Sequence, residues 1–272
     1  MKPLLGILFA TLLALPAAPA TAAPLLVAAA SDLVYCIDEL AAAFSKHAPG
    51  TAVKVSTGAS GNFVAQIRNG APFHVFLSAD MLYPTQLAKL GAADGATLRP
   101  YAIGRIVLWT TDARFDLGQG MKVLRDPRVT RIAIANPDTA PYGRAARDVL
   151  ERDKLWEAAQ PRLVIGENIA QAAQFVQTGN AQLGIVSLAT VRAPKMAGVG
   201  RYQLISDLGV APIEQGAIVT NAGSKQPMAL RFVRFLGSPP ARAILERHGF
   251  GLPPVSAPVS APVSAKASAS DD

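Results

Sequence analysis

The chain of 272 residues is poor in several of the residues that carry chemistry in proteins. It has one cysteine and three histidines, and charged residues make up only 17%. One cysteine excludes an internal disulfide, and no His, Cys and Asp residues cluster with the spacing of a metal site. Lys and Arg give a net charge of +7, but they are scattered and do not interleave with aromatic residues. This pattern favours a solvated basic surface over a nucleic-acid site.

Hydrophobic residues, by contrast, make up half of the sequence. That fraction is typical of a well-packed α/β protein and argues against disorder over most of the chain. The length allows a large core, in one large domain or two modest ones.

The two ends of the chain are expected to lie outside this folded part. Residues 1–22 resemble a signal peptide, with Lys2 as the positive end, an apolar core from Leu4 to Leu15 and small residues before the cleavage site. The apolar core is too short for a permanent membrane helix. At the other end, 253–272 repeat Pro-Val-Ser-Ala and predict a disordered tail. We therefore expect export to the periplasm with a cleaved signal.

The single cysteine, Cys36, has no partner in an exported chain. A lipid anchor is disfavoured because bulky Tyr35 precedes it and because it lies well beyond the cleavage site. It falls within an amphipathic helical pattern from Asp32 to His47, which predicts a buried, inert thiol.

Between the two ends, apolar strand-like runs alternate with helical patterns. This alternation predicts mostly parallel sheets flanked by helices. The expected strands are 25–29, 52–56, 73–77, 103–110, 132–135, 163–165, 183–187 and 216–220. The expected helices are 32–47, 61–69, 83–90, 142–152, a run from 169, 227–237 and 239–248.

Four strand ends pass directly into helices with polar or glycine-containing turns. They contain Ser31, Ser60, the stretch 141–143 and the stretch 167–169. Each turn alone is explained by ordinary helix capping, with Ser31 and Ser60 as N-caps. Together they indicate an anion site, because helix starts offer unpaired N–H groups at the positive end of a dipole.

The chain also resembles a known family in several stretches, in the same order and at the same spacing. They are AAASDL, GASGNFVAQIRNGAPFHVFLSAD, YAIGRIVLW, IAIANPDTAPYGRAA, GENIAQAAQFVQTGNAQLGIVSLA and ERHGFGLP. These stretches are similar to periplasmic molybdate-binding proteins of ABC-type importers, within the type II periplasmic-binding-protein family.

The resemblance implies two α/β lobes, one formed by 24–103 plus 217–250 and the other by 104–216. It also implies hinge crossovers at 101–109, the stretch YAIGRIVLW, and near 214–216. The implied role is capture of molybdate, or tungstate, between the lobes and delivery to an inner-membrane ABC permease. It implies a monomer that is not an enzyme and needs no cofactor.

Carried over position by position, the resemblance assigns five ligand positions to this sequence. Side-chain hydroxyls of Ser31 and Ser60 come from the first lobe, and backbone N–H groups of Tyr142 and Ile169 from the second. A fifth position, a Tyr hydroxyl in the family, falls on Ser187, whose shorter side chain is expected to fall short of the anion.

Asp32 is a further departure from the family pattern. As a first-turn residue it favours the helix dipole, and we expect that role rather than contact with a dianion. It also bears on selectivity, because a site made only of donors suits molybdate, tungstate or sulfate, which carry no proton at neutral pH. Hydrogenphosphate needs an acceptor for its proton, and Asp32 is the residue that could provide one. Other tetrahedral oxyanions therefore stay open as an alternative.

A secreted serine hydrolase is the remaining alternative. The stretch GASGN approaches the nucleophile elbow G-x-S-x-G, but Asn62 stands where glycine is required. None of the three histidines, His47, His74 and His248, lies in a loop expected to face Ser60. The sequence therefore favours a binding protein over an enzyme.

Overall fold

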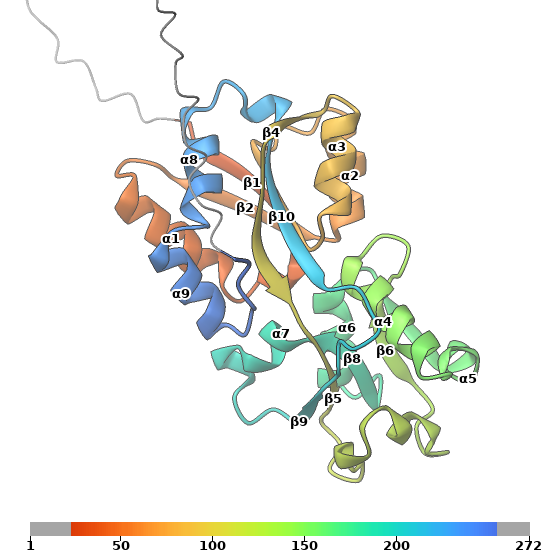
Figure 1. Ribbon diagram of the computed structural model, residues 1–272. Helices are drawn as coiled ribbons and strands as arrows, with labels where there is room; N and C mark the ends of the chain where they lie inside the picture. Colours follow the sequence, from red (N-terminus) through yellow and green to blue (C-terminus); the bar gives the residue numbers. More distant parts are fainter. Residues whose placement is uncertain (1–22, 255–272) are drawn as a thin grey trace, which may run out of the picture.

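The computed structural model describes residues 23–254, and both the predicted signal peptide and residues 255–272 of the predicted tail lie outside this range. The chain forms two five-stranded sheets, each covered by helices, in two lobes (Figure 1). This confirms the predicted two-lobed α/β architecture. In the described range, no helix combines the length and the apolar character that crossing a membrane requires.

The first lobe is built on a sheet of order β2-β1-β3-β10-β4. β1, β2 and β3 are parallel, whereas β10 is antiparallel to both of its neighbours. Leu25, Val27 and Ala29 of β1 pack on one core, and Ala28 packs on another core across the sheet, as strand alternation requires. The strands are β1 (Leu25–Ala30), β2 (Val53–Gly58), β3 (Val75–Ser78), β4 (Ala93–Gly104) and β10 (Ile213–Thr220).

Helices cover both faces of this sheet (Figure 1). One group, α1 (Ile37–His47), α8 (Pro227–Phe235) and α9 (Pro239–Arg247), contributes to the core that contains Val27. The other group, α2 (Ser60–Arg68) and α3 (Leu82–Lys89), contributes to the core that contains Ala28.

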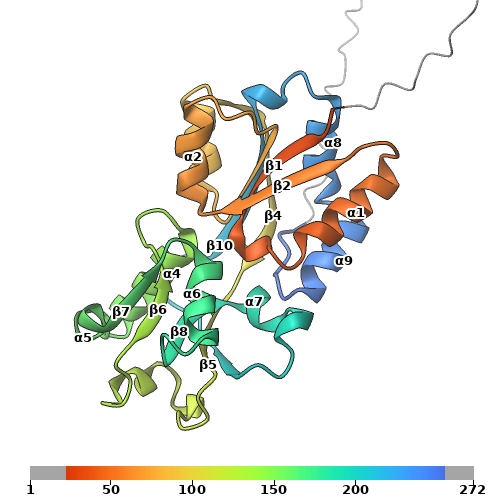
Figure 2. The same ribbon diagram turned by 180° about the vertical axis from the view of Figure 1, so that it is seen from behind.

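The second lobe is built on a sheet of order β7-β6-β8-β5-β9 and has one large core cluster. Its strands are β5 (Ile106–Thr110), β6 (Ile132–Ala135), β7 (Leu163–Gly166), β8 (Leu183–Ser187) and β9 (Arg201–Leu204). Its α-helices are α4 (Pro141–Arg152), α5 (Trp156–Ala159), α6 (Ile169–Gln177) and α7 (Leu188–Arg192). Short 3₁₀ segments include Leu117–Arg125, Gln160–Arg162 and Pro194–Met196. Seen from behind, α6 lies next to the turn that follows β1 (Figure 2).

The chain passes between the lobes twice. The predicted single strand 103–110 is interrupted at Arg105, where the chain leaves β4 of the first sheet and enters β5 of the second. It returns between Leu204 and Ile213. Residues 213–216, predicted in the second lobe, pair with the end of β4 in the first sheet. The antiparallel pairing of β10 with β4 therefore moves the second crossing before 213.

The predicted helix 32–47 is also divided in the structure. A 3₁₀ turn, Ser31–Leu33, is followed by a non-helical turn, and α1 starts only at Ile37 with acidic residues in its first turn. Cys36, directly before α1, is buried, and burial is the main cause that raises the pKa of its thiol. The thiol is thus protonated and shielded from solvent, which confirms the prediction of a buried, inert cysteine.

Candidate functional site

A small cavity lies where the carboxyl ends of strands from both lobes meet. It leaves only ≈ 10 Å³ of free volume, about the room that one water needs. The structure brings together four of the five predicted ligand residues, Ser31, Ser60, Tyr142 and Ile169, around it. The other lining residues are Ala30, Asp32, Gly58, Ala59, Ala79, Ala140 and Pro141.

The first lobe contributes two serine hydroxyls that are free to donate. Ser31 opens the 3₁₀ turn after β1, and Ser60 is the first residue of α2. Neither acts as the predicted N-cap, because the cap positions are Ala30 and Ala59 and neither helix start has a side-chain cap. Ser60 Oγ accepts a hydrogen bond from Ala79 N–H at 3.1 Å and keeps its own proton. Capping therefore does not consume these hydroxyls.

The second lobe contributes backbone N–H groups at two helix starts. α4 begins with Pro141, which has no N–H, so Tyr142 supplies the first donor of that helix. At α6 the Asn168 side chain accepts from Ala170 and Gln171, the next two N–H groups, and not from Ile169. Each helix start thus presents an N–H without an intrahelical acceptor to the same cavity.

Ser187, the fifth predicted position, is not among the residues that line the cavity. It is the N-cap of α7, and its Oγ accepts from Thr190 N–H at 3.2 Å. The same oxygen lies 2.8 Å from Thr190 Oγ1, within a hydrogen bond. Its hydroxyl is therefore engaged in helix capping away from the cavity.

Asp32 lines the cavity beside Ser31 and is 1% exposed. Its Oδ2 accepts from Gln215 Nε2 at 2.5 Å, whereas the buried Oδ1 has no hydrogen-bond partner among the described residues. Burial is the main cause that raises the pKa of this carboxyl to about 6, and the hydrogen bond from Gln215 opposes that rise. An unpaired carboxyl oxygen next to an anion-binding cavity is unusual, because buried polar atoms are nearly always paired.

Gln215 connects this carboxyl to both lobes. It lies on β10, and its Nε2 also donates to the Tyr142 hydroxyl at 3.2 Å, while its Oε1 accepts from Tyr101 on β4 at 2.7 Å. Burial raises the pKa of both tyrosines, so both hydroxyls keep their protons. Gly104, at the end of β4, leaves room for the Tyr142 hydroxyl that any Cβ there would overlap. The sequence pattern does not predict this network, although the crossing predicted near 214–216 includes Gln215.

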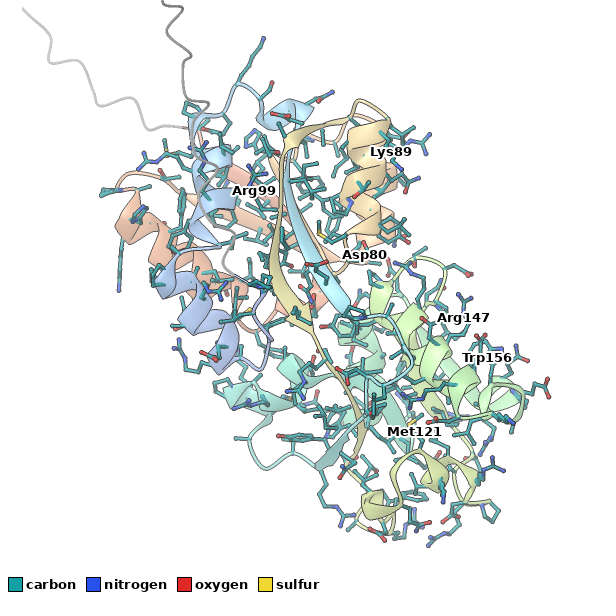
Figure 3. The ribbon with its side chains drawn as sticks, viewed as in Figure 1. Asp80, Lys89, Arg99, Met121, Arg147 and Trp156 are labelled. Carbon is teal, nitrogen blue, oxygen red and sulfur yellow. The ribbon has the colours of Figure 1, made fainter. Side chains whose placement is uncertain are left out.

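Contacts beside the cavity join the two lobes directly. Gly61 N–H donates to Thr139 O at 2.9 Å, and Asn62 donates to Glu167 at 3.1 Å. Arg144 of α4 forms a salt bridge with Asp80 of the first lobe. Figure 3 shows Asp80 at the end of the first lobe that faces the second. These contacts bring the two lobes together beside the cavity.

A second group of these contacts surrounds Tyr83 of α3. Its hydroxyl donates to Asp138 O at 3.2 Å and accepts from Arg144 Nη1 at 3.1 Å. The Arg144 guanidinium also lies 5.0 Å from the centre of the Tyr83 ring. Nothing in the sequence connects these positions, because the partners are more than 50 residues apart.

The part of the chain that the structure describes contains no group of three or more His, Cys, Asp or Glu residues able to hold a metal ion. The cavity instead gathers hydroxyl and N–H donors, which pair with the oxygen atoms of an anion. Two lobes, two crossings and donors on both sides of one cavity are the features of a protein that binds a small solute between its lobes.

Comparisons with known proteins support this class. The chain belongs to the family of bacterial extracellular solute-binding proteins, whose profile matches residues 25–251. It is 40% identical over 237 residues to the molybdate-binding protein ModA of Azotobacter vinelandii, covering 87% of this chain and 93% of that protein. It is 36% identical over 235 residues to ModA of Rhodobacter capsulatus, covering 86% and 90%.

A solved structure is similar over the same range. It is the periplasmic molybdate-binding protein of Azotobacter vinelandii, with a TM-score of 0.78 and 36% identity. The match covers 84% of this chain and 99% of that one. The relative is thus matched over nearly its whole length, in sequence and in fold.

Proposed function

We propose that the protein captures molybdate or tungstate in the cleft between its lobes. The observation that carries this proposal is the set of four donors from both lobes that line one cavity: Ser31 Oγ, Ser60 Oγ and the N–H groups of Tyr142 and Ile169. Relatives at 40% and 36% identity bear the name of molybdate-binding proteins. Together, the donors and the relatives favour a tetrahedral oxyanion as the ligand.

The lobes act as the moving parts of this capture. The cavity holds about one water, whereas molybdate has four oxygen atoms around its metal, so entry of the anion requires the lobes to separate. Rotation at the crossings, at Arg105 and between Leu204 and Ile213, opens the cleft, and the contacts around Gly61 and Arg144 form on closure.

The wider role follows from the relatives. We propose that the protein acts in the periplasm, without a cofactor, as the monomeric binding component of an ABC importer. The signal-peptide pattern of residues 1–22 supports export. The name of the Azotobacter structure supports a periplasmic location.

Sulfate or phosphate is the second candidate ligand class. The four donors suit any tetrahedral oxyanion, and the unpaired Oδ1 of Asp32 offers hydrogenphosphate an acceptor for its proton. The relatives favour molybdate over these anions.

Hydrolysis at Ser60 has little support. In the described residues, His74 Nδ1 accepts from Leu26 N–H and His248 pairs with Glu39. The His47 ring lies 5.8 Å from that of Phe235. Ser60 Oγ pairs with the backbone N–H of Ala79, and within 23–254 no histidine forms the hydrogen bond with it that a general base would form. We therefore propose binding without catalysis.

Calorimetric titration with molybdate, tungstate, sulfate and phosphate tests the proposed ligand. We expect molybdate and tungstate to bind much more tightly than the other two, and molybdate bound in advance to block them. Equal or tighter binding of phosphate or sulfate would overturn the molybdate assignment in favour of the second candidate.

A further inference from the structure

Among the residues that the structure describes, Asp32 has the one acidic side chain that lines the cavity. It resides on the turn Ser31–Leu33, between β1 and the start of α1, so its neighbour Ser31 is one of the proposed donors. Gln215 holds Oδ2, and the free oxygen, Oδ1, is fully buried. A buried carboxyl oxygen without a partner at a ligand cavity points to a partner that arrives with the ligand.

The surroundings of Asp32 give its negative charge no cation. Neutral groups surround it: Gln215 from β10, Tyr142 from α4, Tyr101 from β4 and the thiol of Cys36. Three further elements, β2, α6 and α7, also pack against its turn. The cations on them, Lys54 and Arg192, are exposed, and α6 has no charged residue. Within the described residues Asp32 takes part in no salt bridge.

A dianion in this cavity would lie close to that carboxyl. If Asp32 stayed ionised, two negative groups would share one buried site without an intervening cation, and their repulsion raises the proton affinity of the pair. Once protonated, the carboxyl becomes a hydrogen-bond donor, like the other four groups around the cavity. Gln215 Nε2 fixes Oδ2 as an acceptor, so the proton belongs on Oδ1.

We propose that Asp32 is protonated in the ligand complex and donates from Oδ1 to an oxygen of the bound oxyanion, so that capture of molybdate takes up one proton. This inference rests on the proposed function and adds a fifth donor to the site. The groups around the cavity meet oxygen atoms of the anion, and none of them ligates a metal. The proton comes from solvent and returns to it on release.

The pH dependence of molybdate binding tests the inference. Free Asp32 loses its proton above about pH 6, and molybdate itself carries no proton at neutral pH. The wild-type affinity is therefore expected to fall about tenfold per pH unit between roughly pH 6.5 and 8.5. Calorimetry near pH 8 in two buffers with different ionisation enthalpies is expected to count about one proton taken up per molybdate.

The isosteric variant Asp32→Asn provides the matched comparison. Its amide can accept from Gln215 through oxygen and donate from nitrogen at the position of Oδ1, without titrating. We expect affinity independent of pH, no proton uptake, and binding tighter than wild type near pH 8. The control Ser31→Ala is expected to bind molybdate more weakly at every pH, but its affinity should change with pH as steeply as that of the wild type.

A wild-type affinity that is flat over this range, or a proton count near zero at pH 8, would overturn the inference. These measurements use the wild-type chain alone, so they decide even if Asp32→Asn does not fold. If the affinity of Asp32→Asn changed with pH as steeply as that of the wild type, the inference would also be overturned. A group other than Asp32 would then cause the pH dependence. Failure of the wild type to bind molybdate at any pH would instead contradict the proposed function.

Discussion

The two lobes contribute to the cavity with different parts of the chain. The first lobe presents side chains, Ser31, Asp32 and Ser60, on the turns after β1 and β2. The second lobe presents backbone N–H groups of Tyr142 and Ile169 at the starts of α4 and α6. Single substitutions can change the side chains that the first lobe presents to the cavity. The donors of the second lobe are backbone groups, and their positions depend on where the helices begin. Chemical tuning of the site is therefore expected in the first lobe.

The largest effect is expected from removing a donor of the second lobe. Ile169→Pro deletes the N–H and places the ring near the anion, yet proline is well tolerated at the first position of α6. The preceding Asn168 has φ −147° and ψ 177°, which suits a residue before proline. We expect the molybdate affinity to fall more than about a hundredfold.

The controls for this substitution are Ile169→Val and Ile169→Ala, which keep the N–H and trim only the side chain. They should bind molybdate within a few-fold of wild type in the same titration. Equal losses in all three variants would show that the buried side chain matters and the backbone donor does not.

The next prediction concerns the stability of the ligand-free protein, to which Asp32 of the first lobe contributes. A carboxyl whose pKa rises from 3.8 to about 6 on folding binds more protons in the folded state than in the unfolded state. The contribution of this carboxyl to the free energy of unfolding is therefore most favourable below about pH 4. It declines as the pH rises to about 6 and is constant above that pH. At pH 7 the burial of Asp32 costs up to about 3 kcal/mol of unfolding free energy.

Asp32→Asn should accordingly stabilise the ligand-free protein at pH 7 but not at pH 4. Urea unfolding of both proteins over this range measures the difference. A stability difference that does not change with pH would contradict the assigned burial of an ionised carboxyl.

Ser31→Ala removes a side-chain donor and leaves the second lobe untouched. A hydrogen bond to a charged group contributes roughly 1.5–3 kcal/mol, so the affinity should fall about ten- to a hundredfold. Ser60→Ala should lose at least as much, because Ala79 N–H also loses its acceptor. If both variants bound molybdate as tightly as wild type, the assignment of Ser31 and Ser60 as ligand donors would be wrong.

A smaller effect is expected where the lobes touch without contacting the ligand. A Cβ on Gly61 would lie 2.9 Å from Thr139 O and 2.7 Å from the Tyr83 hydroxyl. Gly61→Ala therefore opposes closure, at about 1–2 kcal/mol or roughly five- to thirtyfold in molybdate affinity. Gly95→Ala, whose Cβ meets only Ala88 of the first lobe, is the control and should bind normally. Solution scattering of Gly61→Ala should show a more open molecule.

The smallest effect is expected at Ser187. Its hydroxyl caps α7 and bonds Thr190, so Ser187→Ala should leave the molybdate affinity unchanged in titration. It should lower stability by about 1 kcal/mol through the lost cap. A loss of affinity similar to that of Ser31→Ala would place Ser187 in the site after all.

Local sequence patterns encode some of these features and not others. Short apolar runs bounded by turn residues predicted the buried strands, including β1 and β3. β9 was not predicted, because all four of its residues are exposed and only its pairing with β5 defines it. The sequence also predicted serine caps at the wrong helices: Ser31 and Ser60 do not cap, whereas Ser187 does. Cap geometry depends on backbone angles that residue type alone does not determine.

Long-range partners explain the other differences. Asp32 was expected to interact with the helix dipole, but its hydrogen-bond partner Gln215 is 183 residues away. The salt bridge from Arg144 to Asp80 likewise joins positions 64 residues apart. Such pairs become visible only once the fold has brought the two crossing strands and both lobes together.

The small volume of the closed cavity has a kinetic consequence. Because the anion is proposed to enter a cavity of ≈ 10 Å³ only when the lobes separate, we expect its release to require the same separation. The residence time of the ligand is then set by the opening rate, and molybdate and tungstate should leave at similar rates even where their equilibrium affinities differ. Substitutions that weaken only the contacts between the lobes should shorten this residence time without removing a hydrogen bond to the anion.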